Sequence, residues 1–143
     1  MAITVRPARA EDAEQLFALV QQLGHAIEPR REAFEQTLSA YLAGEEPSVT
    51  LLVASGEDGA LLGYALTTVV RLLSTNGPSA QLQEIVVSEQ ARGMAVGSTL
   101  VAAVEQLCRD RGVTQLTVAS RRAGGFYDRL GFHENAEYMR KLF

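Results

Sequence analysis

The chain has 143 residues, of which 47% are hydrophobic and 21% charged, and this balance is ordinary for a globular protein with a real core. Its formal net charge of −4 argues against nucleic-acid binding, because proteins that bind nucleic acids carry a basic face. The single cysteine, Cys108, excludes an intramolecular disulfide and a cysteine-rich metal site. We expect no bound metal.

The N-terminal residues contain no apolar signal core, and no apolar run approaches the length needed to span a membrane. The sequence therefore predicts a cytoplasmic protein that does not associate with membranes. The absence of repeats, low-complexity tracts and linkers predicts one domain over residues 1–143.

The first part of the chain predicts one strand and two helices. Residues 3–6 alternate in polarity as a strand does. Residues 10–14 include the acidic Glu11, Asp12 and Glu14, which suit a helix start, and Gly24 suits the end of that helix. A second helix follows the connection at residues 25–31, and its apolar positions are Phe34, Leu38, Tyr41 and Leu42.

The middle of the chain predicts three strands. Residues 49–54 and 61–73 are apolar stretches separated by a turn-like segment, so they predict an antiparallel hairpin. Residues 74–79 form a second turn by composition. The run at residues 80–87 contains β-branched side chains and predicts a buried strand.

The last part predicts a helix at residues 96–111, a strand at 113–119, a short helix at 123–130 and a final strand at 136–142. Cys108 lies on the apolar stripe of the long helix, so we expect a small core residue and not a nucleophile. Hairpins dominate this order, with one strand–helix–strand crossover. The predicted fold is α+β, with a mixed, mostly antiparallel central sheet flanked by helices.

Residues 92–98 form a glycine-containing loop between the strand at 80–87 and the helix at 96–111. The first N–H groups of a helix lack internal partners and attract anions. Gly93 and Gly97 lack a Cβ, so an anion can approach the backbone. A plain strand-to-helix connection has the same spacing, and a nucleotide-binding domain is disfavoured because no Gly-Lys-Ser/Thr follows.

Arg92 to Gly97, Arg-Gly-Met-Ala-Val-Gly, resembles the pyrophosphate loop of the GNAT acyl-CoA N-acetyltransferases, Arg/Gln-x-x-Gly-x-Gly/Ala. Ala95 stands in the place of the middle glycine. An alanine there is harmless at helical backbone angles and costly at a positive φ.

Residues 123–132, Ala-Gly-Gly-Phe-Tyr-Asp-Arg-Leu-Gly-Phe, predict a helix that ends at Gly131, with its apolar side chains in the core. They also resemble the GNAT signature Ala-x-x-Phe/Leu-Tyr-x-x-x-Gly-Phe at every defined place. Ser120 stands where many members of that family carry asparagine. The order of elements resembles the GNAT fold over nearly the full chain.

The resemblance implies an N-acetyltransferase that uses acetyl-CoA as its donor and transfers the acetyl group directly in a ternary complex. Many family members dimerise, so a homodimer is implied as well. The residues implied in binding acetyl-CoA are Ile85, Val86, Val87, Arg92, Gly93, Met94, Ala95, Val96, Gly97, Ser98, Ser120 and Tyr127.

The chemistry suggests two catalytic residues. An alkyl amine with a pKa of about 10.4 must lose a proton before it attacks, and a carboxylate can accept that proton. Glu84 is the candidate base; the alternative is that it faces solvent or pairs with an arginine. Tyr127 is the candidate acid for the leaving thiolate, because a phenol with a pKa of about 10 is a donor at neutral pH.

By analogy with the family, the connection between the first two helices lines the acceptor site, which makes His25, Glu28 and Arg30 candidates. Tyr64 is a further candidate. Each of these has an ordinary alternative role on the surface or in strand packing. We expect a small-molecule primary amine as acceptor, with a peptide or protein amine left open. The alternative function is a non-catalytic acyl-CoA-binding sensor or interaction module with the same fold.

Overall fold

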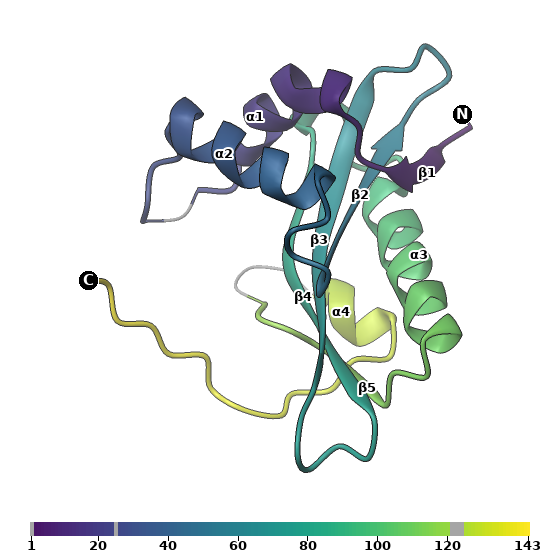
Figure 1. Cartoon of the computed structure of the whole chain (residues 1–143). Helices are drawn as coiled ribbons and strands as arrows, with labels where there is room; N and C mark the ends of the chain where they lie inside the picture. The colour runs from purple at the N-terminus through teal and green to yellow at the C-terminus, as the bar shows by residue number, and fades with distance from the viewer. Residues whose placement is uncertain (1, 25, 121–124) are drawn as a thin grey trace.

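The computed structural model describes residues 2–24, 26–120 and 125–143 (Figure 1). Its strands form one sheet in the order β1-β2-β3-β4-β5, in which β4 and β5 are parallel and the other neighbours are antiparallel. The strands are β1 (Thr4–Pro7), β2 (Val49–Ser55), β3 (Leu61–Arg71), β4 (Pro78–Val87) and β5 (Gln115–Val118). The mixed, mostly antiparallel sheet and the β2–β3 hairpin confirm the predicted fold class.

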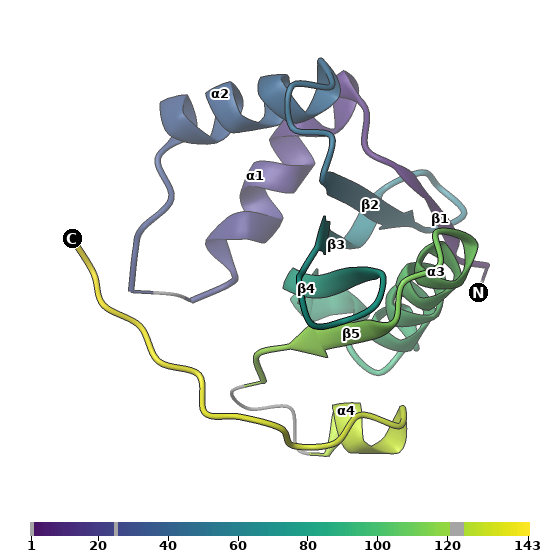
Figure 2. The ribbon, with the colours of Figure 1, turned by 60° about the horizontal axis from the view of Figure 1, so that its bottom comes forward.

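Helices cover both faces of this sheet (Figure 2). The α-helices are α1 (Ala13–Gln21), α2 (Arg31–Leu42), α3 (Val96–Asp110) and α4 (Phe126–Arg129), and short 3-10 helices cover Ala10–Asp12 and Glu89–Ala91. α1 and α2 pack on one face, and α3 and α4 pack on the other. None of the helices in the described ranges is both long and apolar enough to cross a membrane.

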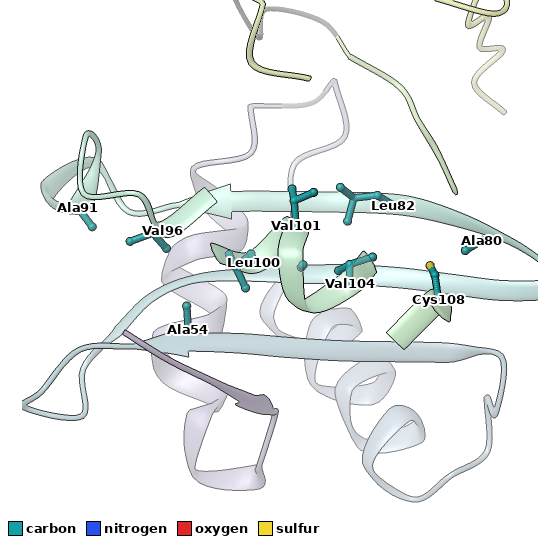
Figure 3. Close-up of a cluster of buried hydrophobic side chains, with 10 residues drawn as sticks. Ala54, Ala80, Leu82, Ala91, Val96, Leu100, Val101, Val104 and Cys108 are labelled. Carbon is teal, nitrogen blue, oxygen red and sulfur yellow. The ribbon is translucent and has the colours of Figure 1, made fainter. Parts of the chain in front are cut away.

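Two apolar clusters hold these layers together. The α3 face buries Ala54, Ala65, Ala80, Leu82, Ala91, Val96, Leu100, Val101, Val104 and Cys108 (Figure 3). The α1/α2 face buries Leu16, Leu19, Leu38, Val53, Leu61, Tyr64 and Val86. Cys108 is only 7% exposed and its pKa is raised chiefly by burial, which confirms it as a core residue.

An ion pair fixes the first strand to the first helices. The guanidinium of Arg6 donates to both carboxylate oxygens of Asp12 at 2.8 and 2.9 Å, and the backbone N–H of Arg9 donates to Asp12 at 2.8 Å. Asp12 is buried, and the hydrogen bond from Arg6 holds the pKa of its carboxyl below its usual range. Asp12, which belongs to the acidic helix start expected from the sequence, therefore also holds β1 in place through Arg6.

A β-bulge in β4 changes which side chains face which helices. Leu66 pairs with Glu84, but the next residue, Thr67, pairs with Leu82, so Gln83 is the extra residue. Side chains alternate between the two faces of a regular strand, and one extra residue reverses that alternation. Leu82 consequently faces α3, whereas Glu84 faces α1 and α2.

The prediction of a final strand at residues 136–142 is wrong. This segment runs away from the sheet (Figure 2), and Tyr138, Met139 and Leu142 are 65%, 85% and 51% exposed. Among the described residues no strand pairs with this segment, so a strand there would lack ladder hydrogen bonds. The predicted helix at 123–130 is shorter, at Phe126–Arg129, and residues 123 and 124 lie outside the described ranges.

Candidate active site

A pocket of about 400 Å³ lies between α1, the connection that follows it, α2 and the middle of the sheet. Strands β3 and β4 contribute Tyr64 and Glu84 to it, and the connection contributes Glu28 and Arg30. Its other lining residues are Leu16, Val20, Ile27, Pro29, Ala33, Phe34, Thr37, Leu38, Tyr41, Leu51 and Leu66. A larger, more open depression of about 750 Å³ runs along α2, and no candidate site residue is among its described lining residues.

Glu84 is held by a tyrosine of the neighbouring strand. The Tyr64 hydroxyl donates to Glu84 Oε1 at 2.8 Å, and Tyr64 is only 2% exposed. Burial, with a further contribution from the Glu84 charge, raises the pKa of Tyr64 above its ordinary range, so the phenol is a permanent donor. Within the described ranges Glu84 has no ion-pair partner, and its second oxygen accepts no protein hydrogen bond.

Tyr41 was not predicted to belong to this site. It lies on α2, half-buried, and lines the pocket with Glu84. Its pKa is raised first by burial and then by the negative charges of Glu84 and Glu46. The sequence signal for Tyr41 was weak. Its hydroxyl is a polar group at one of the apolar positions of the second predicted helix.

The edge of β4 is open beyond its pairing with β5. The parallel pairing runs from Ser79–Gln115 to Leu82–Val118, where β5 ends, while β4 continues to Val87. Among the described residues nothing pairs with this last part of β4 on the β5 side. The predicted donor-binding residues Ile85, Val86 and Val87 lie there, so backbone polar groups on this edge are available to a ligand.

The predicted anion loop leads into α3 at Val96. Gly93 has a φ of +83° with open space where a Cβ would stand. Ala95 is the N-cap residue at a φ of 64°, and no side chain caps the helix within the described ranges. The carbonyl of Ala95 accepts hydrogen bonds from the Thr99 backbone N–H at 3.1 Å and the Thr99 hydroxyl at 2.7 Å.

These features favour an anion at the start of α3. The first N–H groups of α3 point out of the helix without internal acceptors, and the helix dipole favours an anion there. Ala95 adopts the positive φ at which an alanine is strained by about 1–2 kcal/mol. Ala95, which replaces the middle glycine of the GNAT loop pattern, therefore has a backbone φ that favours glycine.

Gly97 has a packing role as well as a place in the loop. A Cβ on Gly97 would lie 3.3 Å from Cζ of Phe126 and 3.7 Å from a methyl of Val87. The ring of Phe126 thus occupies the space that the missing side chain leaves. Gly97 allows α4 to pack against the start of α3, which brings the second motif next to the loop.

Tyr127 follows Phe126 on α4 and packs on the α3 face. Its ring centroid lies 5.0 Å from that of Phe126 and 5.5 Å from that of Phe132. Burial raises the pKa of the phenol, so it remains protonated at neutral pH. Tyr127 and Glu84 lie on opposite faces of the sheet, and the described residues show no contact between them.

The remaining predicted residues lie in the loop, in the first turn of α3, at the end of a described range or outside the described residues. Arg92 and Met94 are exposed in the loop, and Ser98 donates its hydroxyl to the Ala95 carbonyl at 3.2 Å. Ser120 is exposed at the end of a described range, and His25 lies outside the described residues.

Nowhere in the described part of the chain do three or more His, Cys, Asp or Glu side chains gather in a way that could hold a metal ion.

The described part of the chain thus combines a mixed sheet with an open β4 edge, a glycine-containing loop at the start of α3 and a carboxylate in a neighbouring pocket. The acetyltransferase (GNAT) family model matches residues 12–132. The chain therefore belongs to the GNAT acetyltransferase family and is an acetyl-CoA-dependent N-acetyltransferase.

Several known proteins are similar to this chain in sequence or in fold. A thialysine N-epsilon-acetyltransferase from Bos taurus is 26% identical, over 94% of this chain and 86% of its own length. A glucosamine-6-phosphate N-acetyltransferase from Arabidopsis thaliana has the same fold, with a TM-score of 0.85 at 18% identity, covering 100% of this chain and 99% of the other. A transcriptional regulator from Bacillus halodurans C-125 has a TM-score of 0.86 at 20% identity, covering 99% of this chain and 100% of its own.

Proposed function

We propose that this enzyme acetylates the primary amine of a small molecule that binds between α1 and α2, with Glu84 as the general base. The observation that carries the proposal is the position of Glu84. Glu84 lies on the α1/α2 face of β4 with Val86 and lines the pocket, where Tyr64 holds one carboxylate oxygen at 2.8 Å. The other oxygen is available to an ammonium group or to a water between them.

The acceptor class is supported by the shape of the pocket and by a relative. The pocket is concave and mostly apolar, with few polar groups, as small-molecule sites are. The bovine relative is named for an N-epsilon amine acceptor. We therefore favour an amine at the end of a side chain over an amine that is part of a protein surface.

The donor site consists of the open β4 edge and the α3 loop. Ile85, Val86 and Val87 would offer backbone groups to the pantetheine arm, and Gly93 to Ser98 would hold the diphosphate, with Arg92 beside it. Ser120 and Tyr127 would lie near the acyl end. When bound, acetyl-CoA supplies an acetyl thioester whose thiol is the leaving group.

Proton movement is assigned to two side chains. Glu84 accepts the proton of the ammonium group, because an amine nitrogen attacks only when it is neutral. Tyr127 remains protonated through burial and donates to the leaving sulfur. No nucleophilic side chain is required, and Cys108 is buried among apolar residues.

The experiment is release of CoA thiol from acetyl-CoA across polyamines, amino acids, aminoglycosides and short peptides. A blank without enzyme and a blank without amine are both needed, and we expect the second to stay low because Cys108 is buried with a raised pKa. Turnover with a small amine supports the proposal. Acetyl-CoA binding without turnover of any amine would contradict it and favour the non-catalytic acyl-CoA-binding alternative.

A further inference from the structure

The position of α4 depends on side-chain contacts more than on backbone pairing. Among the described residues, the backbone hydrogen bonds of residues 125–132 join only groups within that stretch, such as the Arg129 N–H and the Gly125 carbonyl at 3.1 Å. A helix of four residues has too few internal hydrogen bonds to be stable by itself. The contacts that α4 makes with the rest of the molecule therefore decide where its side chains lie.

Phe126 makes such a contact with the start of α3. Its ring takes up the space in which a Cβ of Gly97 would lie, because that Cβ would be 3.3 Å from Cζ and 3.6 Å from Cε1 of the ring. Val87, at the end of β4, borders the same space at 3.7 Å. Gly97 lies inside α3 without a positive φ, so its backbone conformation is open to any residue. The missing side chain therefore makes room for the Phe126 ring.

The ring of Phe126 also contacts Tyr127. Their ring centroids are 5.0 Å apart at an interplanar angle of 75°, which is the edge-to-face arrangement that aromatic pairs prefer. Phe132 makes a second such contact with Tyr127, at 5.5 Å and 72°. Burial alone raises the pKa of the Tyr127 phenol, and within the described ranges no hydrogen bond holds its hydroxyl. The neighbouring rings therefore determine where that hydroxyl lies.

We propose, on the basis of the proposed function, that Phe126 is a positioning residue for N-acetyl transfer. Its ring is seated on Gly97 and fixes the place of the Tyr127 hydroxyl, which donates a proton to the leaving sulfur. A proton donor has to lie within about 2.6–3.2 Å of its acceptor, so a small displacement of this ring lowers the rate. The glycine at position 97 thus serves the placement of the acid as well as the anion loop.

Two simpler roles for these residues make different predictions. If Phe126 only fills the core, its replacement lowers the free energy of unfolding without a specific effect on proton transfer. If the glycine at position 97 serves only the anion, a side chain there raises the KM for acetyl-CoA and leaves kcat unchanged. In the proposed role kcat falls, and the loss depends on the Tyr127 hydroxyl.

Gly97→Ala is the first variant, assayed with the amine that gives the highest turnover. Its methyl would meet the Phe126 ring at 3.3 Å, so the ring has to shift by a few tenths of an ångström. Misplacement by 1 Å can cost about a hundredfold in rate, so we expect kcat to fall about tenfold. The N–H of residue 97 is kept, so the KM for acetyl-CoA should change little. A raised KM with unchanged kcat overturns the inference.

Gly56→Ala is the matched control for the added methyl. A Cβ on Gly56 would lie 3.5 Å from its nearest atoms, which is an ordinary contact distance, and this turn lies between β2 and β3. We expect its kcat to equal that of the wild type. An equal loss of kcat in Gly56→Ala and Gly97→Ala overturns the inference.

The second comparison repeats Gly97→Ala in a chain that already carries Tyr127→Phe. This chain has no hydroxyl to misplace, so the further loss of kcat should shrink from about tenfold to about twofold or less, as coupled residues do in a double-mutant cycle. A loss of kcat that is equal in both chains overturns the inference. Urea unfolding of each variant ensures that folded proteins are compared.

Phe126→Leu is the second variant, because leucine keeps an apolar side chain but not the ring. Its loss of kcat should depend on the Tyr127 hydroxyl in the same way. Phe17→Leu is the control, because Phe17 packs against Phe34, with ring centroids 5.2 Å apart, and contacts no residue of α4 in the described ranges. Whatever Phe17→Leu does to kcat should be equal with and without the Tyr127 hydroxyl. A loss in Phe126→Leu that is equally independent of Tyr127 overturns the inference.

The same variants separate this inference from the function on which it rests. If Tyr127→Phe alone leaves kcat unchanged, the proposed acid role fails and the inference fails with it. If Tyr127→Phe lowers kcat but the effects of Gly97→Ala and Phe126→Leu do not depend on it, the inference fails and the proposed function stands. Losses that appear only when the Tyr127 hydroxyl is present support both.

Discussion

The Tyr64 hydroxyl donates to Glu84 Oε1 at 2.8 Å from the neighbouring strand of the sheet. Tyr64 pairs with Val86 and Leu66 pairs with Glu84, so Tyr64 and Glu84 are diagonal neighbours on one face. The pairing is regular from Gly63–Val87 to Leu66–Glu84, and the bulge at Gln83 lies just beyond it, so Glu84 and Leu82 face opposite sides of the sheet. If Glu84 is the general base that we propose, Tyr64 acts through it as a positioning residue.

Replacement of Tyr64 by phenylalanine should lower kcat about tenfold, since it removes one hydrogen bond to a charged group. The ring and its packing remain, so the KM for acetyl-CoA should change little. Steady-state kinetics with each substrate varied in turn will measure this split. Tyr41→Phe is the control, because Tyr41 lines the same pocket without a hydrogen bond to Glu84. An equal loss of kcat in both variants would argue against the positioning role.

Tyr127→Phe tests the proposed acid on the other face of the sheet. The phenylalanine ring can keep the contacts with Phe126 and Phe132, so acetyl-CoA affinity and stability should be nearly unchanged. Loss of a general acid should lower kcat about a hundredfold. The exposed Tyr138 offers a control in Tyr138→Phe, for which we expect no change. If kcat of Tyr127→Phe equals that of the wild type, Tyr127 has no part in proton transfer.

Much of the fold follows from local patterns in the sequence. The apolar stripe of α3 predicts a helix at 96–111, and the structure has Val96–Asp110 with Cys108 buried on that stripe. The period of a helix and the alternation of a hairpin are properties of one segment, so they can be recognised without knowledge of neighbours. The position of the helix start also locates the anion loop.

The features that complete the candidate site depend on contacts between segments. The bulge at Gln83 is a matter of register between β3 and β4, and Leu-Gln-Glu-Ile alone is compatible with a regular strand. The reason for glycine at position 97 is the ring of Phe126, which comes from another helix. The final strand at 136–142 was wrong for a related reason, since propensity alone does not supply a partner strand.

Ala95→Gly should stabilise the protein, because alanine at a φ of 64° is strained. Relief of about 1–2 kcal/mol is partly offset by the greater freedom of glycine in the unfolded chain, so we expect a net gain of about 0.5–1 kcal/mol. Urea unfolding measures the difference. Ala102→Gly is the control, because this exposed residue lies inside α3, where glycine should cost about 1 kcal/mol. Destabilisation by both substitutions would mean that position 95 is not strained.

The Arg6–Asp12 ion pair predicts how stability depends on pH. The hydrogen bond from Arg6 lowers the pKa of Asp12 in the folded state, whereas the unfolded residue has a pKa of about 3.9. The ionised carboxylate therefore stabilises the fold fully above that unfolded value, and this contribution is lost as the pH falls through the lower folded value. Asp12→Asn should cost about 2–3 kcal/mol at pH 7, because it leaves the Arg6 charge without its partner.

The difference in free energy of unfolding between the wild type and Asp12→Asn should then narrow as the pH is lowered from 5 toward 2. Urea titrations at several pH values will measure it. Asp110→Asn is the matched control, because Asp110 is exposed and, among the described residues, its side chain accepts a hydrogen bond only from the neutral amide of Gln106. A difference for Asp12→Asn that stays constant over this range would show that the folded carboxyl titrates like the unfolded one. The Arg6–Asp12 pair would then contribute to the free energy of unfolding through its packing and not through its charge.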